Sequence, residues 1–200
     1  GIESVVKIMK NRWHAGGISM TGDILAVPIY STGKEIDEIH SSVLFYNLQN
    51  GRLPKQFRKA SIERPGEKAG AVALLKIPNN NRFLVAVWSD ADDAKKNKKL
   101  RPRLDFYLSD KEDLFSGFSR AATWYADEVS AAPGQKPTFD KFQTIHFILQ
   151  QDHKLFVTGM HNTRKLSGRD FADLYRIHFK QGSIFKDSPS VEIDKVEKVA

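Results

Sequence analysis

Three carboxylates lie within four residues at Asp90-Ala91-Asp92-Asp93. Closely spaced aspartates supply the several oxygen ligands that a hard cation requires, so calcium is the metal expected at Asp90, Asp92 and Asp93 if this loop binds one. The segment lacks the glycine and the distal glutamate of an EF-hand, and lysines follow it directly. We therefore favour a charged loop that neutralises itself, with calcium binding as the alternative.

The formal net charge of +7 is concentrated in two segments. Residues 52–68 carry six basic and two acidic residues, and residues 90–103 carry six basic and three acidic ones, so these segments contribute +4 and +3. The basic residues of the second segment are Lys95, Lys96, Lys98, Lys99, Arg101 and Arg103. Such a tract neutralises phosphates, but residues 95–103 contain no aromatic side chain to stack on a base. We therefore favour a solvated loop, with nucleic-acid binding through these basic residues as the weaker alternative.

Of the six histidines, none has the spacing of a helical metal site, and His-Glu-x-x-His is absent. His14 precedes Ala15-Gly16-Gly17 and is expected at the mouth of an inner strand. If the protein is an enzyme, His14 is the candidate catalytic residue, because this position would place it near a central channel.

The sequence excludes several other kinds of chemistry. It has no cysteine, which removes disulfides, thiolate metal sites and cysteine nucleophiles. Gly-x-Ser-x-Gly, the Walker loop and Gly-x-Gly-x-x-Gly are also absent. We expect no cofactor, apart from the calcium alternative.

Short apolar runs are the elements that must position these residues. The runs at 24–30, 83–88 and 155–160 are rich in β-branched and aromatic residues and are bounded by turn formers, which favours buried strands. Pro28 weakens the first of them unless it lies at an edge or a bulge. No run is long enough for a transmembrane segment.

The runs belong to a longer repeat of four expected strands. Alignment on Leu25, Leu84 and Leu155 gives offsets of 59 and 71 residues, and alignment on three aromatic strands through Tyr46, Tyr107 and Tyr175 gives 61 and 68. We interpret the chain as one β-repeat domain over residues 1–200, with copies at about 14–64, 65–130 and 139–200 and an unpaired outer strand at 5–13.

Gly16-Gly17, then Gly22-Asp23-x-Leu25-x-Val27 and Val43-x-Phe45-Tyr46, resemble the blade pattern of secreted β-propeller proteins of unassigned activity. The resemblance implies an all-β fold of antiparallel four-stranded blades, about three in number, and a secreted or periplasmic protein. An antiparallel sandwich or an open barrel would use the same strands. A closed propeller needs about four to eight blades. We therefore expect a partial propeller from a longer chain.

In a propeller, the loops between the fourth and first strands and between the second and third strands share one face. That face would group the candidate ligand-binding residues His14, His40, Asp90, Asp92, His161 and Arg164. The function expected is a binding or scaffold module that holds a protein or a small molecule there. The alternative is a propeller-type hydrolase or lyase that uses carboxylates and His14 near a central channel and depends on calcium.

Overall fold

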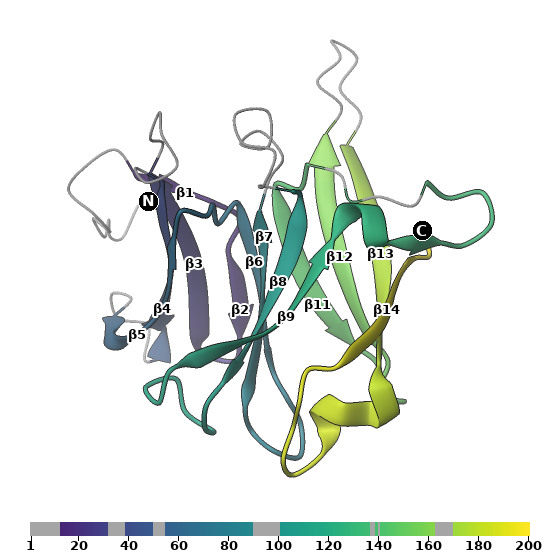
Figure 1. Cartoon of the computed structure of the whole chain (residues 1–200). Coiled ribbons are helices and arrows are strands. Elements are labelled where there is room, and N and C mark those ends of the chain that lie inside the picture. The colour runs from purple at the N-terminus through teal and green to yellow at the C-terminus, as the bar shows by residue number, and fades with distance from the viewer. Residues whose placement is uncertain are drawn as a thin grey trace.

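A computed structural model of the chain describes residues 13–31, 39–49, 55–89, 101–136, 139, 141–162 and 170–200. These residues form three sheets that stand side by side, which we call the N-terminal, central and C-terminal sheets (Figure 1). Nearly all strand pairs are antiparallel, and each sheet is built mainly from consecutive strands. The expected all-β, antiparallel class is confirmed.

The N-terminal sheet has the order β1-β3-β4-β5, with β2 beside β3. Its strands are β1 (Trp13–Ala15), β2 (Ser19–Thr21), β3 (Ile24–Ser31), β4 (His40–Asn47) and β5 (Lys55–Pro65). The expected outer strand at 5–13 lies outside the described residues apart from Trp13, which begins β1.

Pro28 lies inside β3 without weakening it. The inner edge of β3 faces β1 and β2, which are interrupted around Gly16, and the Gly16 amide donates to the Pro28 carbonyl at 2.9 Å. In an antiparallel strand, the carbonyl and the N–H of one residue point to the same side. The N–H that Pro28 lacks would therefore point toward Gly16, as its carbonyl does. The proline therefore removes no hydrogen bond from the ladder to β4.

The central sheet consists of β6 (Ala71–Lys76), β7 (Phe83–Ser89), β8 (Arg103–Ser109) and β9 (Phe118–Tyr125). The C-terminal sheet consists of β11 (Thr144–Leu149), β12 (Leu155–Asn162), β13 (Asp170–Phe179), β14 (Ile193–Lys198) and β10 (Ser130–Ala131), which pairs with β14 in parallel. Two 3₁₀ segments, η4 (Ala126–Glu128) and η5 (Lys180–Phe185), follow β9 and β13.

A tyrosine occupies the corresponding strand in each of the three sheets, and its partner in the preceding strand allows the sheets to be aligned. The equivalent pairs are Leu25 with Tyr46, Val85 with Tyr107, and Val157 with Tyr175. The alignment on Leu25, Leu84 and Leu155 is therefore wrong by one residue in the central sheet and by two in the C-terminal sheet. A shift of one residue moves a side chain to the opposite face of a strand, so the register decides which residues face each neighbouring sheet.

Two apolar clusters fill the spaces between neighbouring sheets. One lies between the N-terminal and central sheets and includes Phe45, Val85 and Leu74. The other lies between the central and C-terminal sheets, where Trp88 packs edge-on against Phe142 with ring centroids 5.1 Å apart. Each cluster joins two sheets, so neighbouring sheets pack through continuous cores.

The inner strands of the three sheets converge near Gly17. This residue forms a parallel bridge to Ala71, and its amide donates to the Gly70 carbonyl at 3.1 Å. A Cβ atom on Gly17 would lie 2.3 Å from the Gln143 carbonyl oxygen, which belongs to the chain that enters β11. Glycine permits this close backbone approach.

Candidate functional site

The candidate site lies at one end of the three sheets. Strands β3, β7 and β12 finish and β4, β8 and β13 begin at this end, which is the upper end in Figure 1 and which we call the loop end. Eight of the sequence-predicted site residues lie outside the described residues: Asp90, Asp92, Asp93, Lys95, Lys96, Lys98, Lys99 and Arg164. The structure therefore places only His14, His40, Arg101, Arg103 and His161 of the predicted set.

His14 and His40 both lie in the N-terminal sheet. The His14 ring is exposed and stacks on Tyr30 with centroids 5.5 Å apart. His40 is exposed at the start of β4, where its amide donates to the Ser31 hydroxyl at 3.1 Å. Neither imidazole has an ion pair to a carboxylate within the described part of the chain.

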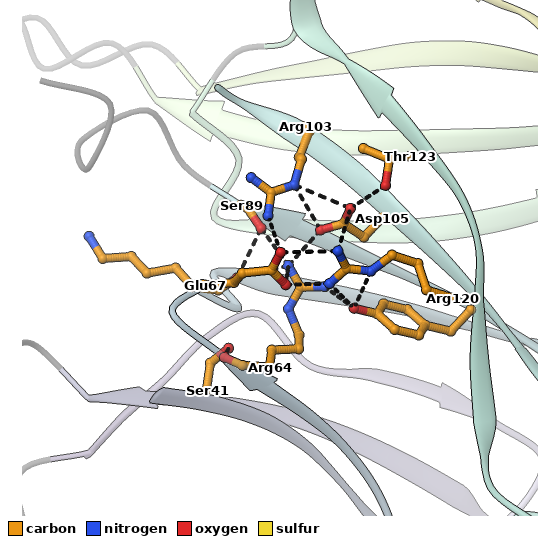
Figure 2. A network of polar contacts seen from close by, with 10 residues as sticks. Ser41, Arg64, Glu67, Ser89, Arg103, Asp105, Arg120 and Thr123 are labelled. Atoms are coloured by element: carbon orange, nitrogen blue, oxygen red, sulfur yellow. Dashed lines mark hydrogen bonds and ion pairs between the residues drawn. The ribbon is translucent and has the colours of Figure 1, made fainter. Parts of the chain in front are cut away.

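A buried polar network joins the N-terminal and central sheets near the loop end (Figure 2). Its centre is the ion pair between Arg64 in β5 and Asp105 in β8, with Nη2 and Oδ2 2.6 Å apart and both side chains fully buried. Ser89 and Thr123 complete the first contacts: Arg64 donates to the Ser89 hydroxyl at 2.7 Å, and the Thr123 hydroxyl donates to Asp105 at 2.7 Å. The hydrogen bonds offset the desolvation of the two charges.

A second carboxylate, Glu67, joins two further arginines to this network. Arg103 donates to Glu67 at 2.7 Å and lies 3.1 Å from Asp105. Arg120 donates to both oxygens of Glu67 and, at 2.7 Å, to the Tyr107 hydroxyl. Three guanidinium groups thus surround two carboxylates, and each arginine contacts at least one of them (Figure 2).

The network changes the proton affinity of its acids. Burial acts to raise the pKa of Asp105, but the charges of Arg64 and Arg103 and the hydrogen bond from Thr123 outweigh it, so the pKa lies below its usual value. Burial raises the pKa of Tyr107 despite its arginine neighbours. Asp105 is therefore a carboxylate and Tyr107 a neutral phenol at neutral pH.

Arg101 and Arg103 come from the expected basic tract but differ in environment. Arg103 is 6 % exposed and bound to two carboxylates, so its guanidinium is not part of a solvated surface. Arg101 is accessible, forms an ion pair with Asp127, and lies over the Tyr125 ring at 4.0 Å. The sequence analysis did not predict the network. It counted the charges in residues 52–68 and 90–103, and such counts do not show which arginine pairs with which carboxylate.

His161 lies at the loop end of β12, beside a hollow of about 160 Å³. The hollow is lined by Gln143, Thr144, Met160, His161, Asn162 and Asp170. Behind it, Nε2 of His161 lies 3.3 Å from Oδ2 of Asp173, and Lys198 lies 2.8 Å from the other oxygen of that carboxylate. His161 thus lies beside both a hollow and a carboxylate, whereas His14 and His40 have no ion pair to a carboxylate within the described part of the chain.

Asp173 repeats the position of Asp105. Each lies two residues before the equivalent tyrosine of its sheet, Tyr175 or Tyr107, and each faces the preceding sheet with a basic partner. The Tyr175 hydroxyl donates to Asp173 at 3.0 Å. The sequence signal that could have indicated both buried acids is the shared Asp-x-Tyr spacing, at 105–107 and 173–175.

Two further observations concern metals and membranes. Within the described ranges, no group of three or more His, Asp and Glu side chains is arranged to hold a metal ion. None of the described helical segments has the length and apolar character needed to cross a membrane.

Comparison of the sequence with protein-family models and with curated proteins finds no match.

Proposed function

We propose that this chain is a binding or scaffold module of β-propeller type that holds its ligand at the loop end, in the hollow beside His161. The observation that carries the proposal is the chemistry of the hollow. Side chains of Gln143, Asn162 and Asp170 line it and make no hydrogen bond within the described part of the chain. Such groups can bind a ligand without first breaking an internal hydrogen bond.

The packing of the sheets supports a propeller-type arrangement. The Tyr107 face of the central sheet packs on the N-terminal sheet, and the Tyr175 face of the C-terminal sheet packs on the central sheet. Repetition of one packing direction is how propeller blades follow one another. Met160 occupies the position in the C-terminal sheet that Trp88 occupies in the central sheet, yet Met160 is 46 % exposed and Trp88 1 %. A further blade would cover this face.

The hollow favours a ligand that donates hydrogen bonds and carries positive charge. The Asp170 carboxylate has no ion pair within the described residues, and the carbonyl oxygens of Gln143 and Asn162 are further acceptors. Asp173 lies behind them and is already neutralised by Lys198. An ammonium or guanidinium group, such as that of a lysine or arginine side chain, fits this set of acceptors.

The test uses free arginine as the probe and backbone NMR shifts as the measurement. Arginine should shift the amides of residues 143, 162 and 170, and Asp170→Asn should weaken the affinity about tenfold, because a charged hydrogen bond is lost. Asp194→Asn is the matched control, since Asp194 is exposed in β14 and the change in charge is the same. Equal affinities of the two variants, or shifts scattered over the protein, would contradict the proposal.

The enzymatic alternative, a hydrolase or lyase, is better supported at His161 than at His14. The carboxylate of Asp173 lies close enough to orient the His161 imidazole, which is the arrangement of many general bases. A panel of chromogenic esters and glycosides, with His161→Ala beside the parent protein, tests this reading.

The calcium proposal for Asp90, Asp92 and Asp93 is tested by thermal melting with and without calcium. If these residues bind calcium, its addition should raise the melting temperature of the protein.

A further inference from the structure

A second hollow lies at the opposite end of the C-terminal sheet. It has a volume of about 330 Å³ and is formed by the turn at 152–154, the end of β13 at 176–179, and Phe185 in η5. The turn and η5 lie at the lower end of the sheet, away from the loop end (Figure 1). The site is therefore separate from the hollow beside His161.

The main feature of this hollow is Arg176, a half-buried arginine without a matching carboxylate. Glu197 is its neighbour across the ladder of β13 and β14. Glu197 instead accepts a hydrogen bond from Lys195 at 2.9 Å and lies 3.4 Å from His178, and the hydrogen bond from Lys195 holds the pKa of Glu197 below its usual value. Arg176 has no hydrogen bond or ion pair within the described residues.

The remaining polar groups of the hollow add donors. His153 and His178 both line it, as does Lys154. The lining carboxylate, Asp152, is occupied by Lys154 at 2.5 Å. The charges of Asp152 and Lys154 cancel, so the formal charge of the lining residues, with the histidines left out, is the +1 of Arg176.

One wall of the hollow is apolar and aromatic. It includes Ile177, Phe179 and Phe185, and the His153 ring lies 4.9 Å from the Phe185 ring. A guanidinium group binds two oxygens of a carboxylate or phosphate with parallel hydrogen bonds, and aromatic rings favour a flat apolar group beside it.

We propose that this hollow binds an oxyanion attached to an aromatic ring, with Arg176 holding the oxyanion and Phe179 and Phe185 contacting the ring. Phosphate and carboxylate share the required chemistry. The inference is independent of the ligand at the loop end.

The test measures the affinities of phenyl phosphate, benzoate and inorganic phosphate by calorimetry at physiological salt. The first two should bind more tightly than inorganic phosphate, because only they reach the aromatic wall. Arg176→Gln should lower their affinity about tenfold or more, and Arg176→Lys should lower it less. Arg101→Gln, which removes the same charge from an accessible arginine elsewhere, should leave both affinities unchanged.

Melting temperatures of all variants show whether the fold is retained. A loss of affinity that is equal for Arg176→Gln and Arg101→Gln would mean that net charge alone attracts the anion, and would overturn the site. Absence of binding by both aromatic anions to the parent protein would overturn it as well.

Discussion

At the scale of single residues, the buried acids matter most. Asp105 and Asp173 occupy equivalent places in two sheets, and each meets a basic side chain at the interface with the preceding sheet. Asp105 is also the meeting point of Arg64, Arg103 and Thr123. The sequence shows that these residues are charged or polar, but their pairing depends on a sheet interface that brings together residues 41 positions apart.

Replacement of Asp105 by asparagine should destabilise the protein by about 3–5 kcal/mol, because the buried Arg64 charge loses its partner at 2.6 Å and keeps Glu67 at 3.5 Å. Urea denaturation measures this difference in the free energy of unfolding. Asp194→Asn, at an exposed position, should change the free energy by no more than about 0.5 kcal/mol. A change at Asp105 as small as that at Asp194 would show that the ion pair contributes little.

The lowered pKa of Asp105 also predicts how stability depends on pH. The folded protein holds this carboxylate deprotonated at pH values where the unfolded chain, with a carboxyl pKa of about 3.9, binds a proton. The stabilisation is therefore complete above about pH 4 and is lost as the pH falls toward the folded pKa. Unfolding free energies of the parent and Asp105→Asn should converge on acidification; a difference that widens toward low pH would refute the assignment.

At the scale of elements, the strands could be predicted well and their registers less so. The three apolar runs coincide with β3, β7 and β12, since short β-branched segments between turn formers fit buried strands. In the central sheet, the leucine alignment is wrong by one residue because the adjacent apolar residues Leu84 and Val85 are both buried, one on each face of the sheet. Periodicity cannot assign faces in a strand that is covered on both sides.

The convergence of the inner strands gives a prediction at this scale. Gly17→Ala should cost about 1–3 kcal/mol, because its Cβ atom would press on the Gln143 carbonyl oxygen and the backbone would have to move. Gly70→Ala is a matched control: the nearest atom to its Cβ, in Trp88, is 3.5 Å away, an ordinary contact. Thermal or urea denaturation of the two variants should separate them clearly, and equal stabilities would refute the close packing of the inner strands.

At the scale of the whole molecule, the C-terminal sheet carries two hollows of opposite chemistry. The hollow at the loop end contains acceptors from Gln143, Asn162 and Asp170, and the hollow at the other end contains Arg176 with two histidines. The sequence predicted His161 as a binding residue from its place directly after the apolar run at 155–160, and in the structure it lies at the loop end of β12. It did not indicate Arg176, because the absence of a counter-ion is a property of the folded sheet and not of the sequence around it.

The most direct test of the loop-end site is a comparison of amide shifts caused by arginine and by phenyl phosphate in one labelled sample. The proposed sites predict two separate groups of residues: 143, 160, 162 and 170 for arginine, and 153, 176, 178 and 185 for phenyl phosphate. If arginine leaves the first group unshifted, or if both probes shift the same residues, the proposed binding site at the loop end is wrong.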